Sequence, residues 1–237
     1  MTERIIADKG LVVRHEIIEL IEHWTIAISG LVLILTGLFE LPIAKRYYIT
    51  EIPGLGWSGD FFLSLELHYI AAAFFVTAAL FHVIYHSMLG HKGILPQKGD
   101  MRESMLVIKS FFSKVEEPPF KKYLPEQRLA YVGMAAIIAM LIITGLVKTY
   151  KNVFDPQINE TLLLVSTWGH NIFFALFVLA FVAHMVAIII KPNRPMVRGI
   201  FTAKVRLDYA RARHPLWIEE IEVSADSKTG EKKIEDT

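Results

Sequence analysis

The stretch that decides the fold is residues 160–191, which reads ETLLLVSTWGHNIFFALFVLAFVAHMVAIIIK. Between Glu160 and Lys191 lie 30 residues without one Asp, Glu, Lys or Arg. A helix needs about 20 mainly apolar residues to cross the hydrocarbon core of a bilayer, so this stretch predicts a membrane-spanning helix. Its ionisable side chains are two histidines, His170 and His184. Ionisable residues inside a membrane are costly and usually functional, so these two are the first candidates for a site.

Three more charge-free stretches lie upstream in the chain of 237 residues, 53% of which are hydrophobic. They contain 17 residues between Glu22 and Glu40, 25 between Glu66 and Lys92, and 19 between Arg128 and Lys148. Their apolar residues are continuous rather than alternating, which excludes the strands of a membrane barrel. We therefore predict an all-α fold, an integral membrane four-helix bundle. Its spans are expected at about 19–40, 62–90, 129–150 and 162–190.

The positive charges predict how the bundle is oriented. Of the 25 Lys and Arg residues, 21 lie in the N-terminal segment, the second loop and the C-terminal tail, and four lie in the other two loops. Cytoplasmic loops carry the excess of Lys and Arg, so both termini, the second loop and the tail are predicted to be cytoplasmic. The four-span domain is expected to cover residues 1–222, and the polar stretch 223–237 is expected to be disordered.

The chain contains no cysteine, which excludes several kinds of redox centre. A disulfide, a protein-ligated iron–sulfur cluster, a covalently attached c-type haem and a cysteine zinc site all need thiol groups. Any redox centre must therefore use other ligands, and an electron-transfer protein of this composition needs an external donor or acceptor. The net charge of +1 does not indicate nucleic-acid binding, because the charges cluster beside the apolar stretches.

Six of the nine histidines lie within the predicted spans, and their spacing pairs them by depth. His170 and His184 are 14 residues apart in span four, which places them within roughly 40° of one helix face and about 21 Å apart along the axis. His68 and His82 repeat this spacing in span two, with His86 on the same face. Spans two and four run in the same direction. His68 and His170 are therefore expected near the outer side, and His82 and His184 near the inner side.

These depths predict two stacked haems, each held by two imidazoles. Bis-imidazole ligation fills both axial positions of the iron and suits electron transfer rather than substrate chemistry. The outer haem has one candidate pair, His68 and His170. The inner haem pairs His184 with either His82 or His23, because span one begins on the inner side. Spacing alone favours His82, which would repeat the 14-residue pattern of the cytochrome b in respiratory bc complexes.

Short motifs spread over most of the chain point to a known family. In chain order they are Glu-His-Trp-Thr at 22–25, Leu-His at 67–68, Lys-Tyr-x-Pro-x-Gln-Arg at 122–128, His170 with His184, and His-Pro-x-Trp-x-x-Glu-Ile-Glu at 214–222. With these motifs the chain resembles the gamma subunit of membrane-bound formate dehydrogenase, a four-helix dihaem cytochrome b that exchanges electrons with quinone. The related b-type cytochromes of nickel–iron hydrogenases share the four spans and the histidine pattern.

The resemblance implies a ligand set for the inner haem. In the family this haem is held by the histidine before the first-span tryptophan and by the second histidine of span four, which here are His23 and His184. The implied outer pair agrees with the depth argument. We follow the family for His23 and keep His82 as its competitor. His82 and His86 are then expected to bond a haem propionate, to serve a quinone or proton path, or to form a helix–helix hydrogen bond.

The resemblance also implies a quinone site on the cytoplasmic side, in the segment that leads into span three. Here that segment is residues 123–128, and Tyr123, Glu126 and Gln127 are its candidate contacts. The chain departs from the family at 124–126, where Asn-x-Gly is frequent. The alternative interpretation of the segment is a helix start, with a proline and an acidic residue in its first turn.

The function implied is electron transfer between an iron–sulfur partner subunit and the quinone pool, either menaquinone or ubiquinone. The chemistry on the primary substrate would belong to a molybdenum or tungsten catalytic subunit, and the location would be the cytoplasmic (inner) membrane of a prokaryote. One alternative is the cytochrome b of a hydrogenase or of a sulfur-compound oxidoreductase. A haem sensor or a transporter represents a different class. Broken helices typify a transporter, and proline is absent from the four predicted spans.

Overall fold

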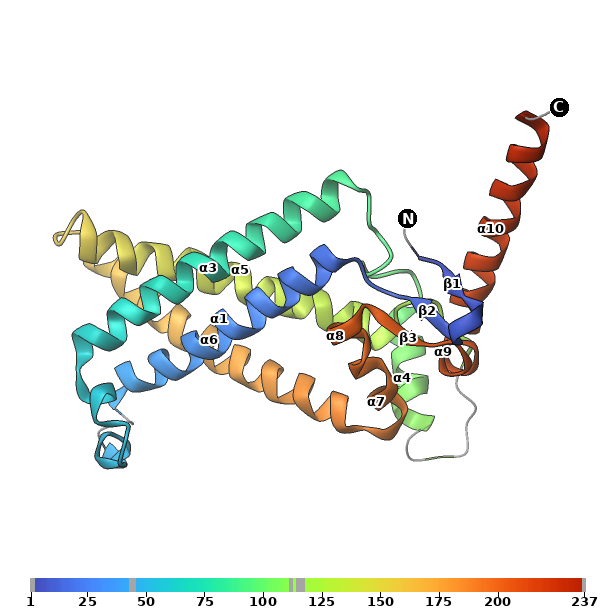
Figure 1. Cartoon of the computed structure of the whole chain (residues 1–237). Coiled ribbons are helices and arrows are strands. Elements are labelled where there is room, and N and C mark those ends of the chain that lie inside the picture. Colours follow the sequence, from blue (N-terminus) through green and yellow to red (C-terminus); the bar gives the residue numbers. More distant parts are fainter. Residues whose placement is uncertain (1–2, 43–45, 111–112, 114–117, 236–237) are drawn as a thin grey trace. The chain divides into compact units, whose positions relative to one another are not determined.

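The computed structural model describes residues 3–42, 46–110, 113 and 118–235, and Figure 1 shows the course of the chain. The chain divides into two compact units. One contains Met1–Ile17, Lys92–Met140 and Leu179–Thr237, and we call it the sheet unit. The other contains Ile18–His91 and Leu141–Val178, and we call it the bundle unit.

Four long helices confirm the predicted spans and the all-α class. They are α1 (Ile17–Glu40), α3 (Phe61–Met88), α5 (Pro125–Val153) and α6 (Glu160–Ile189). Each is long and apolar enough to cross a membrane. Many of their large apolar side chains are exposed, among them Phe74 at 62% and Leu179 at 65%. Apolar exposure on this scale marks a surface that something other than water covers, and for helices of this length that is lipid.

Side-chain caps fix where two of the long helices begin. The Oδ1 atom of Asp60 accepts a hydrogen bond from the backbone amide of Phe62 at 2.9 Å. Asn159 caps α6 similarly, with its Oδ1 atom 3.0 Å from the backbone nitrogen of Leu162. Such caps satisfy amides that have no partner within the helix.

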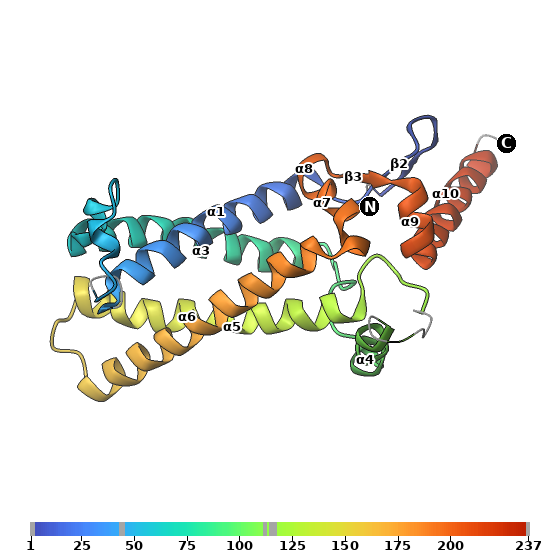
Figure 2. The same ribbon diagram turned by 90° about the horizontal axis from the view of Figure 1, so that it is seen from below.

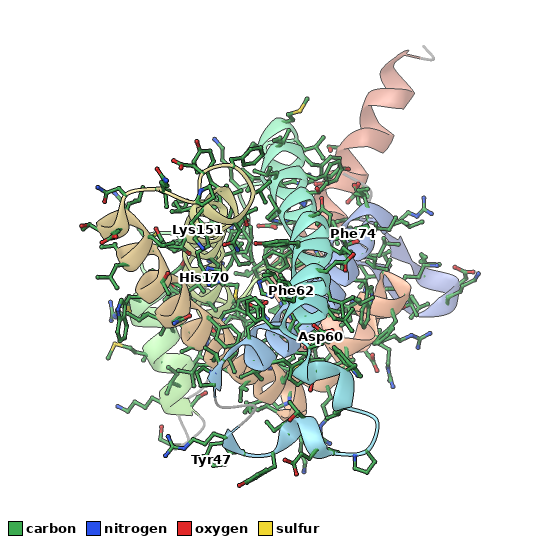
Figure 3. All side chains as sticks on the ribbon, turned by 90° about the vertical axis from the view of Figure 1, so that its left-hand side faces the viewer. Tyr47, Asp60, Phe62, Phe74, Lys151 and His170 are labelled. Atoms are coloured by element: carbon green, nitrogen blue, oxygen red, sulfur yellow. The ribbon has the colours of Figure 1, made fainter. Side chains whose placement is uncertain are left out.

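In Figure 3 the connection between α1 and α3 faces the viewer, with Tyr47 projecting outward from it.

Helices α1 and α3 form an antiparallel pair within the bundle unit, and they lie side by side in Figures 1 and 2. Aromatic packing joins α3 to α6 in the same unit, because the rings of Phe75 and Phe177 meet edge to face with 6.0 Å between their centroids. Gly30 of α1 packs against these rings, where there is little room for a side chain. A Cβ atom at that position would lie 3.3 Å from the Cε2 atom of Phe75, so a larger residue would push the helices apart.

The sheet unit contains a small antiparallel sheet that the sequence did not predict. Its strands are β1 (Ile5–Ile6), β2 (Leu11–Val13) and β3 (Lys204–Arg206), in the order β1-β2-β3. In the register of β2 and β3, Val12 faces Val205. Both valines are fully buried and form a core with Ala210, Trp217 and Ile218. The sheet therefore joins the N-terminal segment to the region that follows the last span.

Several short elements complete the described chain. The remaining α-helices are α4 (Asp100–Ser110), α7 (Arg194–Val197), α8 (Gly199–Thr202), α9 (Leu207–Arg213) and α10 (Pro215–Glu235). The 3-10 turns are η1 (Ala7–Lys9), η2 (Ile49–Glu51), η3 (Gly56–Gly59) and η4 (Lys191–Asn193). Figure 2 shows α9 and α10 following β3. Helix α10 extends through the polar stretch as far as Glu235. The disorder expected for residues 223–237 and the cytoplasmic orientation of the termini both stay predictions.

A buried ion pair holds α4 to the start of α5 within the sheet unit. The guanidinium of Arg128 donates two hydrogen bonds to the carboxylate of Asp100, one of them from Nε to Oδ2 at 2.9 Å. Nη1 of Arg128 also donates to the carbonyl oxygen of Tyr123 at 2.8 Å. The hydrogen bond from Arg128 holds the pKa of Asp100 below its usual value. A two-point contact of this kind fixes orientation as well as distance.

Two of the sequence motifs meet in this unit. Glu3 accepts a hydrogen bond from Nε1 of Trp217 at 2.7 Å and pairs with Nζ of Lys122 at 2.6 Å. The buried guanidinium of Arg14 lies 5.0 Å above the ring of Trp217 and donates to the carbonyl oxygen of Lys122. His214 donates from Nδ1 to the carbonyl oxygen of Lys121 at 2.7 Å. The motifs at 122–128 and 214–222 are thus structural partners.

The burial of His214 makes the sheet unit sensitive to acid. Burial, followed by the nearby charge of Arg14, lowers the pKa of His214 to about 4. The unfolded chain binds a proton at this residue near pH 6.5, so the folding free energy that depends on neutral His214 is present above pH 6.5 and is lost as the pH falls toward 4. We expect His214→Gln to reduce the slope of the free energy of unfolding against pH over this range by up to about 1.4 kcal/mol per pH unit, so that Tm also depends less on pH.

The measurement is the thermal unfolding of the purified full chain in detergent at several pH values between 4.5 and 7. Glutamine keeps a donor for the carbonyl oxygen of Lys121 but does not titrate. Comparing the slopes of Tm against pH for the two proteins removes the contributions of all other groups. Equal slopes would show that His214 binds its proton as readily in the folded protein as in the unfolded chain.

Candidate functional site

The bundle unit places the two predicted outer ligands in matching environments. Nδ1 of His68 on α3 lies 2.8 Å from Oγ1 of Thr36 on α1. Nδ1 of His170 on α6 lies 3.0 Å from Oγ1 of Thr144 on α5. Both imidazoles are half-buried, and Figure 3 shows His170 on α6. The two rings also lie within electrostatic range of each other and of Lys148.

The contacts of the two threonines allow one tautomer that suits metal binding. The hydroxyl of Thr36 lies 2.8 Å from the carbonyl oxygen of Val32, and when it donates its hydrogen there, its oxygen accepts from Nδ1–H of His68. Thr144 lies 3.3 Å from the carbonyl oxygen of Leu141 and can accept from His170 in the same way. In that tautomer the proton of each neutral ring is on Nδ1, and Nε2 carries a bare lone pair.

This is the proton arrangement that a metal-bound histidine needs. A ligating imidazole binds through one nitrogen and donates the hydrogen of the other to a neighbouring acceptor, which fixes the ring orientation. His68 and His170 therefore fit the axial ligands of a haem iron, each through Nε2. Lys148 adds a positive charge of the kind that pairs with a haem propionate.

Glycines bring backbone close to both imidazoles. A Cβ atom at Gly145 would lie 3.3 Å from Cε1 of His170, and one at Gly37 would lie 3.8 Å from Cε1 of His68. Gly169 approaches Thr144 in the same way, because its Cβ atom would lie 3.3 Å from Cγ2 of that residue. Small residues let helices approach closely in a membrane. Here they allow α5 and α6 to meet where Thr144 bonds His170.

The inner histidines of α3 have a different partner, the carboxylate of Glu22 on α1. Nδ1 of His82 and Nε2 of His86 each lie 3.0 Å from the same oxygen, Oε2 of Glu22. Glu22 is 4% exposed, and its Oε1 atom has no hydrogen-bond partner among the described residues. His86 extends the cluster, because its Nδ1 lies 2.9 Å from Nδ1 of His91. His82 and His86 thus form the helix–helix hydrogen bonds that were one of three expectations for them.

The two expected ligands of the inner haem lie in different units. His23 belongs to the bundle unit, where it is half-buried and meets Trp24 edge to face at 5.6 Å between ring centroids. His184 belongs to the sheet unit, and its side chain is exposed. The inner ligand pair therefore remains a prediction from the sequence, with His82 as the competitor of His23.

A groove lies between α1 and α3 on the bundle unit, with a volume of about 450 Å³. Its lining is mainly apolar, with Thr25, Thr77 and Glu22 as its polar members. The groove shows that the Glu22 cluster lies next to a cavity that a lipid tail or an apolar ligand can fill.

The proposed quinone segment forms the start of α5 in the sheet unit. Oε1 of Gln127 accepts a hydrogen bond from the backbone amide of Leu124 at 3.2 Å, so this side chain caps the helix. The ring of Tyr123 packs beneath the cations of Arg14 and Lys122. Oε2 of Glu126 is buried and has no hydrogen-bond partner among the described residues. Of the three candidates, Glu126 is therefore the one with a buried side-chain atom that has no partner among the described residues.

The sequence did not identify Thr36 and Thr144 as functional residues. A signal was present, since both are polar residues in otherwise apolar spans. Glu19 and His91 were also missed. Their donor atoms lie within 4.8 Å of one another and of His86. Glu19 and His91 lie at the ends of the first and second spans. Ionisable residues are common at span ends, so their presence there does not indicate a functional site.

Comparisons with known proteins identify the family of the chain. The sequence profile of the family described as "Prokaryotic cytochrome b561" matches residues 14–202. The chain is similar to the protein named "Formate dehydrogenase, nitrate-inducible, cytochrome b556(Fdn) subunit" from Escherichia coli (strain K12), with 22% identity over 231 residues that cover 94% of this chain and 98% of the relative. The proteins of that name from Escherichia coli O157:H7 and Shigella flexneri match to the same extent.

The matched region contains all four long helices and both histidine pairs. The family implies b-type haem as the cofactor, and the donor set of the bundle unit fits it. The chain therefore belongs to the prokaryotic cytochrome b561 family and is a membrane electron-transfer subunit of the prokaryotic cytoplasmic membrane.

Proposed function

We propose that the chain carries electrons between an iron–sulfur partner subunit and the quinone pool through two b-type haems, in a respiratory complex of the formate dehydrogenase type. The observation that carries this proposal is the pair of imidazoles, His68 and His170, whose Nδ1 atoms each lie within hydrogen-bond distance of a threonine hydroxyl. When bound, b-type haem supplies one-electron oxidation and reduction at its iron.

The residues of the outer site hold the ligands rather than act on a substrate. Thr36 and Thr144 keep Nε2 of each imidazole unprotonated, which is the form that binds iron. If His68 and His170 both bound the iron of one haem, neither oxygen nor a substrate would have a free coordination site. An iron without a free coordination site can still gain and lose an electron, so the site suits an electron carrier.

For the inner haem we propose His23 and His184, following the resemblance to the formate dehydrogenase cytochromes. His82 is the competitor, and its contact with Glu22 supports either role. A carboxylate that accepts from Nδ1–H would orient His82 as an iron ligand through Nε2, as carboxylates do for many metal-bound histidines. The same contact would equally make His82 part of a hydrogen-bonded cluster beside the haem.

For the quinone we propose a site at the start of α5, with Glu126 as the residue that exchanges a proton with it. Quinone reduction consumes two protons, so the site needs a group that can supply them. The buried Oε2 atom of Glu126 has no protein partner among the described residues, which supports this role. Gln127 instead acts as a helix cap, and Tyr123 as a packing partner of two cations.

Two observations support the proposed partner subunits: the chain contains no cysteine, and its relatives are named as subunits of a larger enzyme. A chain without cysteine holds no iron–sulfur cluster of its own, so electrons must arrive from or leave to another protein. The relatives are named as cytochrome subunits of a formate dehydrogenase, which supports an iron–sulfur subunit and a molybdenum or tungsten catalytic subunit as partners. Purification of the complex from native membranes, with identification of the large subunit, tests this assignment.

The first test concerns the outer haem. The purified chain should contain about two haems b by pyridine haemochrome analysis, and His68→Ala or His170→Ala should each reduce the content to about one. Thr36→Val should keep the haem but weaken its binding or shift its potential, because loss of such a partner typically costs about 10–100-fold in affinity. Retention of two low-spin haems in both histidine variants would contradict the pairing.

The second test separates His23 from His82 as the partner of His184. His23→Ala should abolish the low-spin signal of one haem, whereas His82→Ala should only shift a redox potential, because His82 then acts through hydrogen bonds. The measurement is a redox titration followed by absorbance and by electron paramagnetic resonance. Loss of a haem only in His82→Ala would assign the inner site to the pattern of the bc-type cytochromes.

The third test concerns the quinone. Glu126→Gln should slow oxidation of the reduced cytochrome by a short-chain quinone at least about tenfold, because proton transfer by a positioned side chain contributes about 10²–10⁴-fold to a rate. The haem content should stay unchanged. Gln127→Ala is the control, since it should lower the stability by about 1 kcal/mol through the lost cap and leave the oxidation rate unaltered. Unchanged kinetics in Glu126→Gln would move the quinone site elsewhere.

A further inference from the structure

One cluster of side chains has no part in the proposed electron transfer. It consists of Glu19 near the start of α1, His86 near the end of α3, and His91 just after α3, all within the bundle unit. All three side chains are half-buried. Each of them offers one donor atom, and these atoms lie within 4.8 Å of one another.

The distances are close to those of a metal site. Nδ1 of His86 and Nδ1 of His91 lie 2.9 Å apart and face each other. Tetrahedral zinc binds imidazole nitrogen at about 2.0–2.1 Å, which places two ligand atoms about 3.3 Å apart. A small rotation of either ring therefore suffices. The carboxylate of Glu19 lies at the end of a flexible side chain, which lets it close the remaining gap.

The proton positions on His86 also suit a metal ligand. Its Nε2 atom lies 3.0 Å from Oε2 of Glu22, and a carboxylate can only accept, so Nε2 carries the hydrogen. Nδ1 of His86 is then bare and points toward His91. A carboxylate that orients a histidine through its second nitrogen is the usual support of a metal-bound imidazole. Glu22 provides this support from a buried position, being 4% exposed.

We propose that Glu19, His86 and His91 bind a divalent transition-metal ion of the zinc type, with water as the fourth ligand. Two imidazoles and one carboxylate are a common donor set for zinc. Magnesium and calcium prefer oxygen ligands throughout, so they are poor occupants. Binding requires that the hydrogen between the two Nδ1 atoms leaves that position, by moving to Nε2 of His91. The ion then ties the start of α1 to the end of α3.

A second group, Glu22 with His82 and His86, has donor atoms at similar spacing but is a poorer site. Both imidazole nitrogens that face Glu22 lie 3.0 Å from the same oxygen atom. Two N–H donors on one carboxylate oxygen already satisfy that oxygen, and a metal would have to displace both hydrogens.

The test is zinc binding by the purified, haem-loaded full chain in detergent. After equilibration with Zn²⁺ and removal of the excess, elemental analysis should find about one zinc per chain, counted separately from haem iron. His91→Ala and Glu19→Gln should each weaken zinc binding at least about tenfold. Addition of Mg²⁺ in excess should not displace the zinc. Hydrogen exchange of the amides at 86–92 should slow with Zn²⁺ in the parent protein and not in His91→Ala.

Two matched controls accompany these variants. Glu16→Gln changes a carboxylate one turn before Glu19, and His15→Ala removes a histidine outside the cluster. Both should retain the zinc content and the slowed exchange. Equal zinc binding by the parent, His91→Ala and Glu19→Gln would overturn the proposal, as would a parent protein that binds no zinc. Haem content, measured on every sample, shows that each variant is folded.

Discussion

The hydrogen bond from an imidazole to a threonine hydroxyl is the interaction on which the outer site depends. A polar group inside the hydrocarbon of a bilayer must find its partner within the protein. Thr36 and Thr144 each also lie within hydrogen-bond distance of a helix carbonyl oxygen. When they donate their hydrogens to these carbonyl groups, their oxygens accept from Nδ1 of the two histidines. The same bonds orient the rings and, in the proposed site, would leave Nε2 for iron.

The transmembrane helices could be predicted because the property that defines a span, a long run of apolar residues, lies within one continuous segment of sequence. A charge-free run long enough to cross a bilayer identifies a span without knowledge of its neighbours, and all four spans were found in this way. The helix ends were less predictable. Helix α5 begins at Pro125 rather than near 129, because Gln127 caps it and Arg128 is held by Asp100. The sheet could not be predicted, since its strands are two or three residues long and β3 is far from β1 and β2 in sequence.

The sequence predicts the depth of the site residues but not their contacts. A spacing of 14 residues gives the separation of two histidines along one helix, and the common direction of spans two and four led to the prediction that His68 pairs with His170. The rotation of each helix about its axis decides which neighbours meet, and no pattern within one span determines that rotation. The partners Thr36 and Thr144 were therefore missed. Glu22 was recognised only as the neighbour of His23, whereas its carboxylate contacts two histidines of α3.

The bundle thus contains histidines with two kinds of partner, and the partner determines what each ring can do. A hydroxyl oxygen is a neutral acceptor, so it would add little to the basicity of the opposite nitrogen of His68 or His170 in the proposed site. A carboxylate accepts the same hydrogen with a full negative charge, which raises the basicity of the opposite nitrogen. A haem held by His82 would therefore receive more electron density from its ligand than one held by His68, and its redox potential would be lower. If His23 is the inner ligand, the charge of Glu22 instead acts through space and is partly offset by the two N–H groups it accepts. In the proposed two-haem arrangement, the redox potential of the inner haem relative to the outer one would therefore depend on which histidine Glu22 supports.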